Sequence, residues 1–128
     1  WTGVNYGAQD VACLLLGSSA LPQISEGRKL EELLNVYWQD FREAVSSRRL
    51  EGRAESAEYT FEEFCRHVKL ACLDYTRVVF GYQLKGRNAD WVRARAALLN
   101  SCTHNRSVPI LLGLVRFVDA LLSELEST

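Results

Sequence analysis

Between Leu30 and Val45, apolar residues recur at steps of three and four, with charged and amide side chains between them. This spacing is typical of an amphipathic α-helix, because about 3.6 residues complete one helical turn. A second segment with the same spacing follows Thr60, and its apolar positions are Phe61, Phe64, Cys65, Val68, Cys72, Tyr75 and Val79. The chain shows no alternating strand pattern and no internal repeat, so the sequence predicts an all-α fold.

About five helices are expected, in one domain of 128 residues. The first starts at about Gln9 or Asp10 and ends at Gly17; because it is apolar nearly all round, it should be the most enclosed element. The helix after Thr60 begins with a capping box, in which Thr60 and Glu63 exchange side-chain-to-backbone hydrogen bonds. We expect it to end near Gly81, which can leave the helix at low cost.

Two further helices complete the predicted fold. Asn88 can cap a shorter helix that runs through Leu99, and Ser107 can cap the last one. Pro109 is tolerated there because the N–H groups of a first helical turn have no partner within the helix. The joins between helices are expected at residues 18–25, 48–59, 84–87 and 101–106, and the charged join at 48–59 should be solvated and mobile.

Composition excludes several classes of protein. Fifteen basic and sixteen acidic residues give a net charge of −1, so no overall field favours a nucleic-acid or anionic-lipid partner. The longest apolar runs, 11–16 and 108–112, are far shorter than a membrane span, and no signal peptide is evident. The four cysteines lack the spacing of a zinc site. We therefore predict no metal site, reduced core thiols and a soluble protein of the cytoplasm or an organelle, not a secreted one.

The run from Gly7 to Ala12, GAQDVA, is followed by leucines. It resembles the G-x-x-D-[LV]-A helix start of the aminoglycoside phosphotransferase and choline kinase-like superfamily, including its ecdysteroid kinase-like branch. The segments LEELLNVYWQDF and TFEEFCRHVKLACLDYTRVVFGY resemble the next two helices of that family, in the same order. The resemblance extends to Tyr82. It implies that the chain is the helical C-terminal subdomain of a two-lobed kinase-like fold, within a longer polypeptide or as a processed subunit.

The resemblance also implies roles for three residues. The Asp that matches Asp10 lies on a buried helix beneath the catalytic loop, where it can accept hydrogen bonds from loop N–H groups. From the residues alone, Asp10 is a helix cap, and both readings stay open. Asp74 and Tyr75 would line the cleft for the acceptor alcohol. The alternatives are that Tyr75 packs in the core and that Asp74 is a solvated charge paired with Arg77 or Arg93.

Phosphoryl transfer needs a base, a metal held by carboxylate and amide oxygens, and a cradle for the phosphates. The family provides an H-G-D-x-x-x-x-N loop, a metal-binding Asp, a Gly-rich loop and a strand lysine, and none of these motifs occurs in this sequence. His67 is expected to be an ordinary, partly exposed side chain, and His104 a loop residue. The chain should therefore not be catalytic alone. It would use ATP and Mg²⁺ only together with an N-terminal part of the kinase-like domain that carries these motifs. The alternative is a non-catalytic structural or interaction subunit, a pseudoenzyme or a fragment, whose partners are protein subunits of a larger assembly.

Overall fold

The computed structural model describes residues 7–17, 29–47, 59–95 and 108–127. Within these ranges every regular element is helical, which confirms the predicted all-α fold. Five α-helices and one π-helical segment follow in the order α1 Gly7–Gly17, α3 Lys29–Ser47, α4 Phe61–Val78, η1 Val79–Gln83, α5 Ala89–Ala94 and α6 Val108–Glu126. No helix among the described residues is long and apolar enough to cross a membrane.

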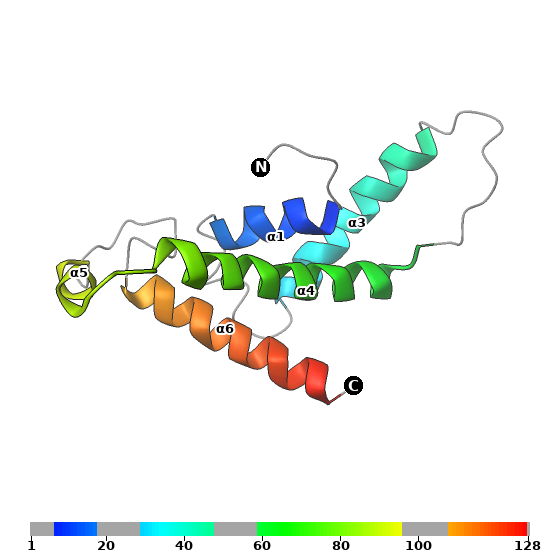
Figure 1. Ribbon diagram of the computed structural model, residues 1–128. Coiled ribbons are helices and arrows are strands. Elements are labelled where there is room, and N and C mark those ends of the chain that lie inside the picture. The colour runs from blue at the N-terminus through cyan, green and yellow to red at the C-terminus, as the bar shows by residue number, and fades with distance from the viewer. Residues whose placement is uncertain (1–6, 18–28, 48–58, 96–107, 128) are drawn as a thin grey trace.

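The central element is α4, and three other helices lie around it (Figure 1). Helix α1 runs beside α4 in the same direction, α6 runs on its other side in the opposite direction, and α3 crosses near its N-terminal end. Lys69 of α4 forms an ion pair with Glu124 of α6. The core lies between these helices, and its most deeply buried large side chains are Leu16, Leu34, Val68, Cys72, Val79 and Leu114.

Helix α1 buries five of its eleven residues, the largest share of any described helix. This confirms the expectation that the opening helix is the most enclosed. Its bounds differ from the prediction, because the helix begins at Gly7 rather than at Gln9 or Asp10. Ala8 is only 6% exposed and belongs to the core, so burial of its methyl group accounts for the additional residues at the start of α1.

The capping box of α4 forms as predicted: the Thr60 hydroxyl accepts from the Glu63 N–H at 3.1 Å. The α-helix ends at Val78 and the helical segment as a whole at Gln83, on either side of the end predicted near Gly81. The chain continues through Gln83 as a π-helix, in which the Leu84 N–H donates to the Val79 carbonyl at 3.1 Å. Among the described residues, the backbone is left-handed at Gly86 alone, with φ of 74°. The fully buried Val79 anchors the π-helical segment to the core, so the helix continues past Gly81.

Helix α5 is short, and local contacts hold it. The Asn88 side chain accepts from the Trp91 N–H at 2.9 Å, which confirms the predicted cap. The guanidinium carbon of Arg95 lies 4.0 Å from the Trp91 ring centroid, a cation–π contact. The helix ends at Ala94. The rest of the predicted helix, through Leu99, lies outside the described residues.

Helix α6 carries Pro109 in its first turn, as predicted. Its predicted cap, Ser107, lies outside the described residues, as do the joins at 18–25 and 101–106 and all of the join at 48–59 except Tyr59. Cys65 and Cys72 are free, buried thiols, in agreement with the predicted core role, and Cys13 is a partly buried free thiol. His104 and Cys102 lie outside the described part of the chain.

Candidate functional site

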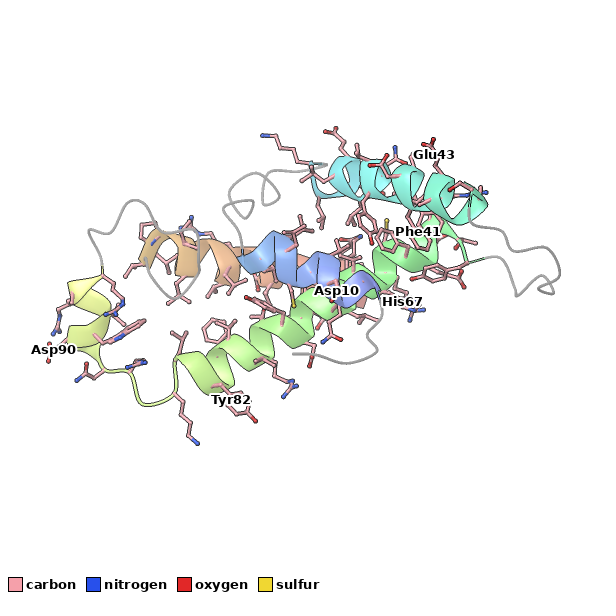
Figure 2. All side chains as sticks on the ribbon, turned by 90° about the horizontal axis from the view of Figure 1, so that it is seen from above. Asp10, Phe41, Glu43, His67, Tyr82 and Asp90 are labelled. Atoms are coloured by element: carbon pink, nitrogen blue, oxygen red, sulfur yellow. The ribbon has the colours of Figure 1, made fainter. Side chains whose placement is uncertain are left out.

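The residue matched to the family's loop-supporting carboxylate, Asp10, lies in the first turn of α1 and is exposed (Figure 2). It is the fourth residue of the helix, so the interpretation of Asp10 as the N-cap is wrong. Because the positive end of the helix dipole lies at the N-terminus, a carboxylate in the first turn is favourable there. Its charge also helps to raise the pKa of the Cys13 thiol, after the larger effect of burial. Asp10 thus presents a solvent-facing carboxylate at the start of α1.

Asp74 is partly exposed on α4 and pairs with Arg77, as one of the sequence alternatives predicted. One carboxylate oxygen accepts from Arg77 Nε at 2.9 Å and lies 2.8 Å from a second guanidinium nitrogen. An exposed pair one helical turn apart contributes little to stability. Asp74 also lines a hollow of about 420 Å³ between α1 and α4, together with Gln9 and His67. Asp74 therefore borders a hollow while its carboxylate pairs with Arg77.

Tyr75 packs against the hydrophobic core and is partly buried, which confirms the core alternative. A methyl group added at Gly17 would lie 3.5 Å from the Tyr75 hydroxyl, so this hydroxyl sits at the C-terminal end of α1. Burial is the main cause of its raised pKa, and the neighbouring Cys13 adds to it. Adjacent helical residues point about 100° apart. In agreement with this, Tyr75 is absent from the hollow that Asp74 lines, and the structure does not bring the two side chains to one site.

A second hollow lies at the N-terminal end of α1, and sequence reasoning missed it. Its volume is about 330 Å³, and five aromatic rings line it: Tyr37, Trp38, Phe41, Tyr59 and Phe64. His67 of α4 and the small residues Gly7 and Ala8 of α1 complete the lining. We call this cavity the aromatic hollow. Phe41 and His67 are labelled in Figure 2.

The aromatic hollow adjoins the Asp74 hollow, because Ala8 and His67 line both. The Tyr59 hydroxyl and His67 Nδ1 lie 2.7 Å apart and form a hydrogen bond. Burial is the largest cause of the raised pKa of Tyr59, followed by the charge of Glu63. His67 is exposed, as predicted, but it is also the polar side chain that the two cavities share.

Thiol chemistry is disfavoured at the described cysteines. Burial raises the pKa of Cys72 to about 12 and is also the largest cause of the raised pKa at Cys13 and Cys65. Because the thiolate is the reactive form, these three thiols are poor nucleophiles at neutral pH. In the described part of the chain, no group of three or more His, Cys, Asp and Glu side chains is arranged to hold a metal ion.

The arrangement offers two adjoining hollows, one lined by aromatic rings and one with Asp74 in its lining. Concave, largely apolar pockets with a few polar groups are typical of ligand sites. Comparisons of the chain with protein-family models, with curated proteins and with solved structures each found no match.

Proposed function

We propose that this chain is the helical C-terminal subdomain of a small-molecule phosphotransferase of the aminoglycoside phosphotransferase and choline kinase-like type. The observation that carries the proposal is the ordered set of resembling segments from Gly7 to Tyr82. The first and last of these segments form α1 and α4, which lie side by side (Figure 1). In the proposed enzyme these two helices form part of the wall of the acceptor site.

In this proposal, Asp10 supports a catalytic loop that this sequence does not contain. An exposed carboxylate can accept hydrogen bonds from N–H groups of a loop that packs over the start of α1, and such charge-assisted bonds are strong. The base, the metal-binding Asp, ATP and Mg²⁺ belong to the remainder of the kinase-like domain. The role of the helices is then to position, because phosphoryl transfer depends on the alignment of acceptor and phosphate.

Asp74 is the better candidate for the acceptor site than Tyr75. Its carboxylate lines the hollow between α1 and α4, whereas the Tyr75 hydroxyl sits at the C-terminal end of α1. A carboxylate at a cavity wall can hold an amino or hydroxyl group of an acceptor through a charge-assisted hydrogen bond. We assign Asp74 to acceptor binding, and Tyr75 to the core that holds α1 against α4.

The test is the intact mass of the native polypeptide, captured with an antibody against the chain and measured by mass spectrometry. The proposal expects a mass well above 14.5 kDa. It also expects a sequence ahead of Trp1 with an H-x-D-x-x-x-x-N loop, followed by a metal-binding Asp. A native polypeptide of 14.5 kDa, or a longer one without these motifs, would overturn the catalytic proposal.

A kinetic test then follows in the longer polypeptide. Asp10→Asn should lower kcat by roughly tenfold to a hundredfold with little change in KM, because a misplaced catalytic loop disturbs alignment more than binding. Asp40→Asn is the matched control, since Asp40 is an exposed carboxylate on α3 that resembles no family site. Equal effects of the two substitutions would contradict the role of Asp10.

The second candidate function is a non-catalytic structural or interaction subunit. Its support is the exposure of large apolar side chains: Leu33 and Val36 of α3 are 43% and 62% exposed, and α6 carries three more. Apolar side chains gathered on one face mark surfaces that a partner covers. A native polypeptide of 14.5 kDa that elutes with a larger assembly would support this function in place of the first.

A further inference from the structure

We propose that the aromatic hollow binds a flat, uncharged aromatic molecule of one or two fused rings. This inference does not depend on the phosphotransferase proposal, because it uses only the lining of the cavity. The volume of about 330 Å³ lies within the range of ligand sites, roughly 300–1,000 Å³. A compact ligand is therefore favoured over an extended one.

The rings of the hollow form a floor and a rim. Trp38 and Phe64 are 5% and 3% exposed and form the floor, with ring centroids 5.3 Å apart. The rim consists of three rings that are each about two-fifths exposed, namely Tyr37, Phe41 and Tyr59. Exposed aromatic surface around a cavity remains available to a ligand, and its burial is favourable.

Several of these rings are nearly parallel. The Tyr37 plane lies 12° from that of Phe64 and 8° from that of Phe41, at centroid distances of 5.5 and 6.5 Å. Aligned faces favour an offset-stacked planar ligand, because aromatic rings gain from each other's quadrupoles beyond the burial of area. A saturated ring of the same size lacks this contribution. The geometry therefore selects for planarity.

The charge of the lining selects for a neutral ligand. Gly7, Ala8 and the five aromatic residues carry no charge, and none of the described residues that line the cavity is an Asp, Glu, Lys or Arg. The polar side-chain groups there are His67 and the tyrosine hydroxyls, and His67 and Tyr59 hydrogen-bond each other at 2.7 Å. A ligand with one polar group can join this pair. An anion would meet no Lys or Arg among the described lining residues, so its burial there would be costly. A cation would be attracted by the ring faces but would find no described carboxylate to neutralise its charge.

Space for the ligand depends on the small residues that begin α1. A Cβ atom added at Gly7 would lie 3.7 Å from the Tyr37 hydroxyl, which is ordinary contact distance. A larger side chain at this position would extend from that point beside the rim. Because Gly7 is exposed and its φ is not left-handed, Gly7→Leu should block the hollow while leaving the fold intact.

The experiment titrates indole into the purified chain and follows amide chemical shifts by NMR. We expect saturable binding, with the largest shifts at Gly7, Ala8 and the residues that flank the hollow. Gly7→Leu and Phe41→Ala should each weaken binding at least tenfold. Phe80→Ala is the matched control, because Phe80 is 41% exposed against 43% for Phe41 but does not line the hollow, and it should change affinity less than twofold.

Two further probes test the ligand class. Cyclohexanol, a non-planar molecule with one hydroxyl, should bind at least tenfold more weakly than indole, and tetramethylammonium should bind no more tightly than indole. Equal binding of cyclohexanol would overturn the planar assignment, and tighter binding of tetramethylammonium would overturn the neutral one. Absence of indole binding, or binding that Gly7→Leu leaves unchanged, would overturn the site itself. Circular dichroism checks that each variant is folded. If Phe41→Ala is unfolded, Gly7→Leu still tests the site, because it removes none of the aromatic rings.

Discussion

At the scale of single residues, Thr60 has a defined energetic role at the start of α4. Its hydroxyl accepts from the Glu63 N–H, and a Glu63 carboxylate oxygen accepts from the Thr60 N–H at 2.9 Å. Thr60→Ala should lower the free energy of unfolding by about 1 kcal/mol, because one amide loses its cap. Urea unfolding followed by circular dichroism measures this change. Thr60→Ser retains the hydroxyl and should stay within about 0.5 kcal/mol of the wild type, so an equal loss in both variants would exclude the cap as the cause.

Glu63 makes the same cap dependent on pH. Hydrogen bonds from Thr60, first from its backbone and then from its side chain, lower the pKa of Glu63 in the folded protein. The contribution of this carboxylate to stability is therefore fully present above its unfolded pKa of about 4.3. It is lost as the pH falls through the lower folded value.

Glu63→Gln should remove this part of the acid dependence, because glutamine can also close a capping box but does not titrate. Unfolding midpoints measured between neutral pH and pH 3 should therefore decline less steeply in Glu63→Gln. The matched control is Glu62→Gln, an exposed neighbour outside the capping box. If the unfolding midpoint of Glu63→Gln fell as steeply with decreasing pH as that of the wild type, the prediction would be contradicted.

The caps at Thr60 and Asn88 could be predicted because each depends on residues three positions apart. Asp10 was misassigned as a cap, since its place inside α1 follows from burial of Ala8 against residues distant in the chain. The Tyr59–His67 hydrogen bond likewise depends on three-dimensional placement. It forms because α4 directs the His67 imidazole toward Tyr59, which lies just before the N-cap of the helix. Sequence spacing of eight residues alone does not distinguish that contact from two separate exposed side chains.

At the scale of elements, two glycines near the end of α4 should respond to alanine in opposite ways. Gly81 lies within the π-helical segment, and an added Cβ there would meet no atom within 4 Å. Gly81→Ala should stabilise the protein by about 0.4–1 kcal/mol, because alanine restricts the unfolded chain more than glycine does. Gly86 has φ of 74°, so Gly86→Ala should destabilise it by about 1–2 kcal/mol. Thermal unfolding of both variants checks the signs, and a stabilising Gly86→Ala would contradict this account.

Periodicity was sufficient to predict the long helices, because their apolar faces repeat over several turns. It could not predict the π-helical segment. A π-helical turn contains one more residue than an α-helical turn. Whether the chain forms one here depends on the burial of Val79 in the core rather than on the local sequence. The glycine at position 81 therefore resembled a helix end, whereas the left-handed turn lies five residues later, at Gly86.

At the scale of the whole molecule, stability should depend on the burial of α1 between the other elements. Leu16 is fully buried, whereas Leu14 on the same helix is 68% exposed. Leu16→Ala should lower the free energy of unfolding by about 2–5 kcal/mol, since it removes buried methyl groups and leaves a cavity. Leu14→Ala should change it by less than about 0.5 kcal/mol. Chemical denaturation of the pair distinguishes a core helix from a loosely attached one, and equal effects would contradict the observed packing.

The aromatic hollow also belongs to this scale, which explains why the sequence did not predict it. Tyr37, Trp38 and Phe41 fall on the apolar stripe of α3, and Phe64 on that of α4, so each pattern by itself indicated core packing. The cavity arises because α3 crosses α4 where Gly7 and Ala8 supply no large side chain. The sequence signal that could have indicated the cavity is the number of aromatic residues on the apolar stripes of α3 and α4, together with the small residues at the start of α1.

Helix α6 has a second apolar edge that the described core does not cover. Leu112, Val115 and Leu122 are 50%, 45% and 45% exposed, while Leu114, Phe117 and Leu121 face the core. Spacings of three and seven residues place the exposed three along one side of the helix. This edge should drive association of the isolated chain, because contact between copies removes apolar surface from water.

Sedimentation velocity at increasing protein concentration should therefore show a rising sedimentation coefficient for the wild-type chain. The double substitution Val115→Lys/Leu122→Lys should abolish the rise, because it places charge on the edge, and should leave the free energy of unfolding within about 1 kcal/mol. Leu14→Lys is the control on α1, where Leu14 is 68% exposed and no other large apolar side chain of that helix is exposed. A rise that persists in the double variant and disappears in Leu14→Lys would assign the interacting surface to α1 instead.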